Sequence, residues 1–115
     1  MKYSHWQLHT SAKNEKNASV VLNRAAKKME VEPVDVEFSF DKEHGNLIAF
    51  SVEHDAQEWS EFIYQIFLLA QRIGFGWCLT GYIDKDPDAS TEHTNLSGVS
   101  FAQWLVYKNG TRESA

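Results

Sequence analysis

Five histidines are the side chains of this chain best suited to bind a metal ion. His5 and His9 lie in a segment that alternates like a β-strand, so their spacing places them about 13 Å apart, too far to share one ion. The others, His44, His54 and His93, come with no cysteine pair and no His-Glu-x-x-His motif. We therefore expect no metal ion and no other cofactor.

Cys78 is the one cysteine and could act as a nucleophile. It lies between Trp77 and Leu79 in an apolar segment and would face away from both, which favours a buried and unreactive thiol. The chain has no Gly-x-Ser-x-Gly motif, no Gly-Lys-[Ser/Thr] motif and no other glycine-rich phosphate loop. We therefore expect no catalytic activity. A single cysteine also excludes an internal disulfide and fits a reducing compartment.

A polar segment late in the chain carries carboxylates that are spaced partly like the ligands of a calcium-binding loop. Asp84, Asp86 and Asp88 alternate as the first ligands of such a loop do. Ala89 stands where the sharp turn needs glycine, and Asn95 stands where the loop needs a bidentate glutamate. Three interpretations stay open for this segment: a solvated turn, a weak cation site, or a loop that contacts a partner.

Charge is segregated along the chain. Residues 1–28 contain six Lys/Arg and one acid, a net charge of +5, and residues 29–115 contain five Lys/Arg and fifteen acids, a net charge of −10. A polarised field of this kind steers association with charged partners. With a pI near 5.4 the domain is a poor candidate for binding nucleic acid, because phosphate contacts need a basic surface. The favoured partner is a basic protein.

Length and composition predict one folded domain that spans residues 1–115. The chain is 43% hydrophobic and 23% charged, which is ordinary for a globular protein with one core. The longest apolar run, Ile66–Ala70, is too short to span a bilayer, and the first ten residues lack the apolar region of a signal peptide. We expect a cytoplasmic protein with a flexible tail at residues 109–115.

Hydrophobic periodicity predicts a strand, a helix and a β-hairpin in the first half of the chain. Residues 5–10 alternate as a strand, and a helix capped by Asn17 or Ser19 runs to Met29, before Pro33. The apolar stripe of this helix is Ala18, Val21, Leu22, Ala25 and Met29. Strands at residues 34–40 and 47–53 flank a loop at residues 41–46. Their core faces are Val34, Val36, Phe38 and Phe40 on one strand, and Ile48, Phe50 and Val52 on the other.

The second half is predicted to contain a helix, a strand, a loop and a last strand. Asp55 as N-cap with Glu58 three residues later has the pattern of a capping box, and Gly74 is expected to end the helix. The apolar stripe of this helix is Trp59, Phe62, Ile63, Ile66, Phe67, Ala70 and Ile73. Strands at residues 75–83 and 98–108 flank a polar loop at residues 84–97.

The element order β-α-β-β-α-β-β predicts an α+β fold of the ferredoxin-like type, an antiparallel sheet with two helices on one face. The last strand is expected to pair with the fourth strand and to extend one edge of the sheet. Trp104 would then face away from the helices, opposite Phe101, Leu105 and Tyr107. An aromatic side chain on an open sheet face would be an anchor for a partner.

We therefore expect a small acidic binding protein that inhibits a basic protein partner, namely an immunity protein or antitoxin that neutralises a toxin or nuclease. The residues expected to bind the partner are Asp55, Glu58, Glu61, Tyr82, Asp84, Asp86, Asp88, Glu92 and Trp104. The acids of the helix start and those of the 84–92 segment could form one patch or two.

Two alternatives stay open. One is a regulatory or mobile-element accessory protein that binds a host enzyme. The other is a homodimeric ferredoxin-like domain that binds a ligand in a pocket of His5, His9, Tyr82 and Trp104.

Overall fold

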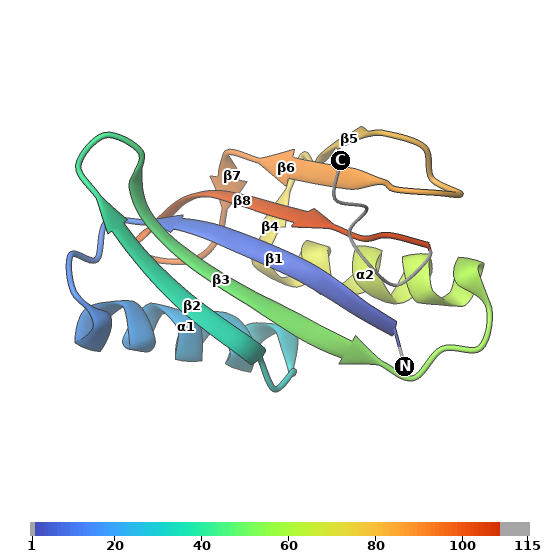
Figure 1. Cartoon of the computed structure of the whole chain (residues 1–115), viewed down its shortest axis with the longest axis horizontal. Helices are drawn as coiled ribbons and strands as arrows, with labels where there is room; N and C mark the ends of the chain where they lie inside the picture. Colours follow the sequence, from blue (N-terminus) through green and yellow to red (C-terminus); the bar gives the residue numbers. More distant parts are fainter. Residues whose placement is uncertain (1, 109–115) are drawn as a thin grey trace.

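A computed structural model describes residues 2–108, so the tail predicted at residues 109–115 lies outside the described residues. The elements, in chain order, are β1 (Lys2–Thr10), α1 (Glu15–Met29), β2 (Val34–Asp41), β3 (Gly45–His54), α2 (Trp59–Ile73), β4 (Gly74–Phe75), β5 (Cys78–Thr80), β6 (Asp88–Thr91), β7 (His93–Thr94) and β8 (Val99–Leu105). The fold is α+β: two helices lie on one side of a six-stranded antiparallel sheet (Figure 1).

The sheet has the spatial order β2-β3-β1-β8-β6-β5, and β4 and β7 form a separate two-stranded ladder. The last strand, β8, lies in the interior of the sheet, where it pairs with β1 and β6. The prediction that it pairs with the strand after α2 and extends an edge was therefore wrong. Residues 78–80, which form β5, occupy the edge instead. β5 and β6 precede β8 in the chain and form a hairpin, and β6 joins this hairpin to the sheet by pairing with β8.

The predicted strand at residues 75–83 is broken into β4 and β5. Gly76 has a φ of +65°, a left-handed conformation that glycine adopts without strain, and the chain bends there. Trp77 then turns inward, donates a hydrogen bond from its indole N–H to the Ala70 carbonyl at 3.1 Å, and packs edge-on against Trp6. The thiol of Cys78 in β5 is exposed rather than buried as expected.

The predicted loop at residues 84–97 contains β6 and β7. Along β6 the side chains alternate, with Ala89 and Thr91 buried toward the helices and Asp88 and Ser90 half-buried on the other face. This period of two was hidden in the sequence because only one of the four residues is apolar. Pro87, just before β6, accepts a hydrogen bond at its carbonyl from the Val106 N–H at 3.2 Å, which anchors the hairpin to the end of β8.

α1 begins earlier than predicted. Asn14 is its N-cap, and the Asn14 side-chain oxygen accepts a hydrogen bond from the Asn17 backbone N–H at 2.9 Å. The helix ends at Met29, and Glu30 follows in a left-handed conformation with a φ of 59°. The predicted apolar stripe is confirmed, since all five of its members are buried.

α2 confirms the predicted helix with two corrections. Its N-cap is Glu58, which makes no side-chain capping hydrogen bond, so the capping box of Asp55 and Glu58 does not form. Gly74 is extended, with a φ of −177°, and leads directly into β4. The buried side chains are Phe62, Ile63, Ile66, Leu69, Ala70 and Ile73, whereas Trp59 and Phe67 at the margin of the stripe are half-buried.

Trp104 lies on the helix face of the sheet, against the prediction. It is 1% exposed, pairs with Trp6 across β1 and β8, and has its ring centroid 5.9 Å from that of Phe67 in α2. The predicted alternation along β8 is confirmed, but the two faces of the strand were assigned to the wrong sides of the sheet. Phe101 and Leu105 therefore lie on the open face.

The edge strand β2 does not alternate cleanly. The pairing register shifts between Val34 and Glu37, and Asp35 has a φ of 52°. As a result Val36, which was predicted to be a core residue, is exposed. Phe40, also predicted to be a core residue, keeps the face of Phe38 but pairs with Asn46 near the β2–β3 turn and is exposed there. On β3 the predicted core face of Ile48, Phe50 and Val52 is buried.

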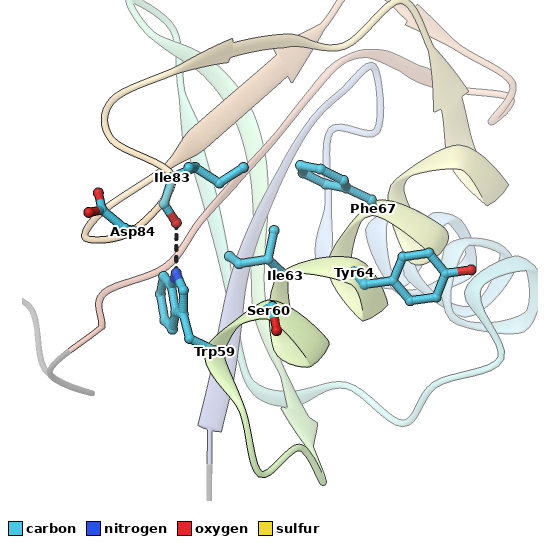
Figure 2. A pocket seen from close by; sticks show the side chains of 7 residues that line it. All are labelled: Trp59, Ser60, Ile63, Tyr64, Phe67, Ile83 and Asp84. Carbon is cyan, nitrogen blue, oxygen red and sulfur yellow. Dashed lines mark hydrogen bonds between the residues drawn. The ribbon is translucent and has the colours of Figure 1, made fainter.

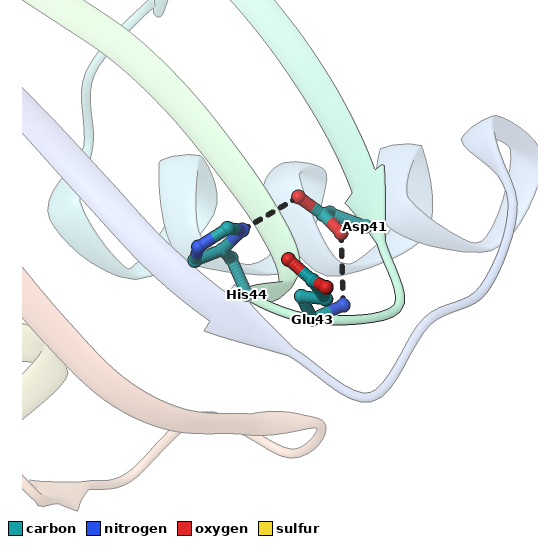
Figure 3. Close-up of polar contacts among 3 residues, drawn as sticks. All are labelled: Asp41, Glu43 and His44. Carbon is teal, nitrogen blue, oxygen red and sulfur yellow. Dashed lines mark hydrogen bonds and ion pairs between the residues drawn. The ribbon is translucent and has the colours of Figure 1, made fainter.

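The β2–β3 turn is closed by a carboxylate (Figure 3). Asp41 accepts a hydrogen bond from the Glu43 backbone N–H at 2.8 Å and contacts His44 Nδ1 at 2.7 Å. The His44 contact, followed by the Glu43 hydrogen bond, lowers the pKa of Asp41. Gly45 completes the turn with a φ of 83°.

Candidate functional site

Large apolar side chains are exposed mainly in one stretch of the chain. Among residues 2–108, six of the ten that are both large and exposed fall between residues 64 and 83: Tyr64, Leu68, Phe75, Leu79, Tyr82 and Ile83. Tyr82 is 70% exposed and Tyr64 is 62% exposed. Leu68 lines a separate hollow with His54 and Arg72, and Phe75 stacks on the His93 ring. Tyr64 and Ile83 share one surface, and exposed apolar side chains grouped in space mark interaction sites more often than scattered ones do.

A cavity of about 310 Å³ lies in this region, between α2 and the segment that follows β5 (Figure 2). Its lining consists of Trp59, Ser60, Ile63, Tyr64, Phe67, Ile83 and Asp84. Trp59, Ile63 and Phe67 recur every four residues and so form one flank of the helix. The sheet packs against the middle of the apolar stripe of α2. The flank formed by Trp59, Ile63 and Phe67 lies at the margin of this contact and forms one wall of the cavity.

A hydrogen bond between the two walls fixes the cavity. The indole N–H of Trp59, at the start of α2, donates to the Ile83 carbonyl at 2.7 Å. The segment after β5 is itself a tight turn, because the N–H groups of Lys85 and Asp86 both donate to the Tyr82 carbonyl at 3.0 Å. The cavity is therefore formed in the free protein, which lowers the entropic cost of filling it.

Acidic side chains flank the cavity. Asp84 lines it, and the Trp59–Ile83 hydrogen bond joins the start of α2, where Glu58 precedes Trp59, to the segment that carries Asp84. Asp86 belongs to the same tight turn as Asp84. The Glu61 carboxylate instead accepts a hydrogen bond from the Gln57 backbone N–H at 3.3 Å, and Asp55 lines a separate hollow with His54 and Leu68. Two lysines lie among these acids, and both sit over aromatic rings: the Lys85 Nζ is 5.7 Å from the Tyr82 ring centroid, and the Lys108 Nζ is 5.8 Å from that of Trp59.

The structure thus divides the predicted binding residues. Glu58, Asp84 and Asp86 lie next to the Trp59–Ile83 contact or in the turn that follows it; we call these three acids the acidic rim, and Tyr82 lies beside them. Asp88 instead points to the open face of the sheet, where its carboxylate accepts a hydrogen bond from the Thr80 hydroxyl. Glu92 lies beyond the other end of β6, and Trp104 is buried in the core.

Sequence reasoning missed the cavity walls Ile63, Tyr64, Phe67 and Ile83 as binding residues. The available signal was the width of the apolar stripe of α2. Trp59 and Phe67 widen the stripe beyond what one sheet contact buries, and Tyr64 adds a further aromatic next to it.

A serine and a histidine are hydrogen-bonded inside the protein. Ser4 Oγ lies 2.7 Å from His54 Nε2, and His54 Nδ1 lies 2.9 Å from Gln65 Oε1. Because Gln65 Oε1 can only accept, His54 donates from Nδ1, and the neutral ring then accepts at Nε2 from the Ser4 hydroxyl. The indole N–H of Trp6 donates to Ser4 Oγ at 2.8 Å. This is the spacing of a nucleophile and a base, but Ser4 is fully buried and no substrate can reach it. The network holds β1, β3 and α2 together.

The two histidines of the predicted ligand pocket, His5 and His9, lie on the open face of the sheet. His5 Nδ1 lies 2.8 Å from the Ser51 hydroxyl. The His9 ring packs edge-on against Phe101, with the two ring centroids 5.0 Å apart. Burial lowers the pKa of His5, and the charge of Asp35 opposes this shift. Because Trp104 faces the helices, the predicted pocket of His5, His9, Tyr82 and Trp104 does not form.

Within residues 2–108, no three His, Cys, Asp or Glu side chains are placed to hold a metal ion. Neither of the two described helices has the length and apolar character needed to cross a membrane. Comparison of the chain with protein-family models, with curated proteins and with solved structures finds no match.

Proposed function

We propose that this chain is a protein-binding module that inhibits a basic protein partner, as an immunity protein or antitoxin neutralises a toxin or nuclease. The observation that carries the proposal is the preformed apolar cavity beside the acidic rim. A large apolar side chain of the partner would fill the cavity and supply the desolvated centre of the interface. The carboxylates around it would face the cations with which a nuclease binds phosphate, and would thereby block them.

We further infer that the body of the protein is a ferredoxin-like unit to which a binding segment has been added. The elements β1, α1, β2, β3, α2 and β8, with the spatial order β2-β3-β1-β8, correspond to the split β-α-β plan. The residues between α2 and β8 are additional to it. This added segment contributes Ile83 and Asp84, one wall of the cavity, while the unit itself contributes α2, the other wall.

The experiment uses the basic protein encoded next to this chain in its genome of origin. Co-expression should relieve the toxicity of that protein, and the purified pair should form a complex whose dissociation constant is measured by calorimetry. Ile83→Glu places a charge in the cavity wall and should weaken binding about a hundredfold, as loss of a central apolar contact does.

The matched control is Val20→Glu, because Val20 is 46% exposed, close to the 48% of Ile83, but lies on α1. This control should bind normally. Equal affinity of both variants would contradict the proposed site, and a neighbouring protein that is neither basic nor toxic would contradict the proposed function.

A second candidate function is homodimerisation through the open sheet face. Leu47 of β3 and Phe101 and Leu105 of β8 are half-buried there, and no element that the structure describes packs over them. A concentration-dependent mass that doubles in light scattering, and that Phe101→Glu abolishes, would favour this candidate over the first.

A further inference from the structure

The sheet has two edge strands, and they differ in protection. β2 has a register shift between Val34 and Glu37, a positive φ at Asp35, and exposed carboxylates at Asp35, Glu37 and Asp41. Irregular backbone and charge of this kind discourage another strand from pairing with an edge. β2 is therefore a guarded edge.

β5 has none of these features. Its three residues, Cys78, Leu79 and Thr80, are uncharged and exposed, and they pair with β6 in unbroken register. Among the described residues no strand lies on the outer side of β5. An edge strand leaves alternate N–H and C=O groups without a partner, so β5 offers main-chain hydrogen bonds to an extended peptide.

The cavity lies on the helix side of this same edge. Leu79 pairs with Ala89, and Ala89 pairs with Trp104, so these three side chains share the face that packs on α2. Trp104 in turn contacts Phe67, a cavity wall, and Ile83 follows β5 closely in the chain. A strand added to β5 would direct every second side chain toward the helix side of the sheet, where the cavity lies.

Acids stand on both faces of such an added strand. On the helix side, Asp84 lines the cavity. On the open face, Asp88 pairs with Thr80 in the strand next to β5. No Lys or Arg occurs between Arg72 and Lys85, so the edge strand itself carries no cation, and the two nearby lysines, Lys85 and Lys108, lie over the rings of Tyr82 and Trp59. This arrangement is complementary to an extended segment that combines apolar and basic side chains.

We propose that the partner binds by strand addition, with an extended basic segment of the partner pairing with β5 and an apolar side chain of that segment entering the cavity. The proposal rests on the proposed function, since it names how the same partner docks. Main-chain hydrogen bonds to Cys78–Thr80 would supply affinity, and the cavity together with Asp84 and Asp88 would select the sequence.

The test uses a short synthetic peptide of alternating lysine and valine, and a twin peptide N-methylated at alternate residues so that one edge cannot donate hydrogen bonds. Hydrogen exchange is measured for the amides of residues 78–80 and of residues 36–40 in β2, and the indole N–H of Trp59 is followed by NMR. We expect saturating peptide to slow exchange in β5 about tenfold or more and to leave β2 unchanged. The N-methylated twin should lose this protection.

The matched variants place lysine on each edge. Thr80→Lys adds a cation to β5 and should reduce peptide affinity about tenfold, which corresponds to ~1.4 kcal/mol. Val36→Lys adds the same charge to β2, where Val36 is 38% exposed, and should bind as the natural chain does.

The outcomes separate the two proposals. A shift of the Trp59 indole signal without protection of residues 78–80 would overturn strand addition and leave the cavity as the binding site. No response of either probe would count against both proposals. Protection of β2, or protection of β5 that arises from dimerisation of the chain alone, would overturn the basic segment as the occupant.

Discussion

Trp6 and Trp104 lie directly opposite each other on neighbouring strands of the sheet, and only one of them has its indole N–H satisfied. Trp6 donates to Ser4 Oγ at 2.8 Å, whereas the buried Nε1 of Trp104 has no hydrogen-bond partner among the described residues. Two tryptophans of equal burial therefore differ in the cost of removing the N–H group.

Trp6→Phe and Trp104→Phe are therefore expected to lower the free energy of unfolding by different amounts. Both changes remove ring volume, but Trp6→Phe also removes a donor to the buried Ser4 hydroxyl, while Trp104→Phe removes an unsatisfied donor. The free energy of unfolding should fall more for Trp6→Phe, by about 1–2 kcal/mol relative to Trp104→Phe. Chemical denaturation of the two variants checks this, and an equal loss would contradict the assigned hydrogen bonds.

α2 is expected to be the main stabilising helix of the core. Phe62 and Ile66 are buried against the sheet, so Phe62→Ala and Ile66→Ala should each lower the free energy of unfolding by ~2–5 kcal/mol. Tyr64→Ala, on the exposed flank of the same helix, should lower it by less than ~1 kcal/mol. Urea denaturation monitored by circular dichroism measures all three, and losses of similar size would show that the helix packs by another face.

Stability should depend on pH through the Ser4–His54–Gln65 network. Burial lowers the pKa of His54, and the Gln65 hydrogen bond opposes this only in part, so the unfolded chain binds a proton there at higher pH than the folded chain does. The free energy of unfolding should therefore fall as the pH drops below the ordinary histidine value of 6.5, and level off below the folded-state pKa.

His54→Gln should flatten this pH profile of stability. The slope that remains is assigned to His5, whose pKa is also lowered by burial, and the double variant with His5→Gln should be nearly flat above about pH 5. Denaturation midpoints across the pH range give the measurement. A slope that both substitutions leave intact would contradict the assignment.

The acidic rim is expected to steer the partner. Reversing Asp84 and Asp86 to Lys should slow association with the basic neighbouring protein roughly tenfold at low salt, with a smaller effect at high salt where charges are screened. Glu92→Lys is the control, because β6 separates Glu92 from the rim. Stopped-flow measurement of the association rate checks this. An unchanged association rate for the variant with both charges reversed would show that the acidic rim does not steer the partner.

Local patterns predicted those elements whose apolar residues are numerous and regular. Ala18 and Met29 at the two ends of the α1 stripe, and Trp6 and Leu8 on β1, could be placed from their spacing because each belongs to a long periodic run. Ala89 could not, since it stands alone among polar neighbours in β6. Its burial depends on pairing with β8, a contact between segments distant in the sequence.

The candidate site was predictable in part for the same reason. Glu58 and Asp84 could be singled out by charge, but their proximity depends on the Trp59–Ile83 hydrogen bond, which no local pattern encodes. The face of Trp104 depended on whether β8 lies inside the sheet or at its edge. Alternation fixes which side chains share a face and leaves open which face meets the helices.

The hairpin of β5 and β6 joins the rest of the sheet through one strand pairing, that of β6 with β8. Most of the core lies elsewhere, on α1, α2, β1 and β3. Substitutions in residues 78–86 can therefore accumulate without unfolding the domain, so this hairpin is free to diverge while the scaffold is retained. Exchanging it for a hairpin of another sequence should therefore alter the surface beside the cavity and keep the fold; under the proposed function, such an exchange would change which partner is bound.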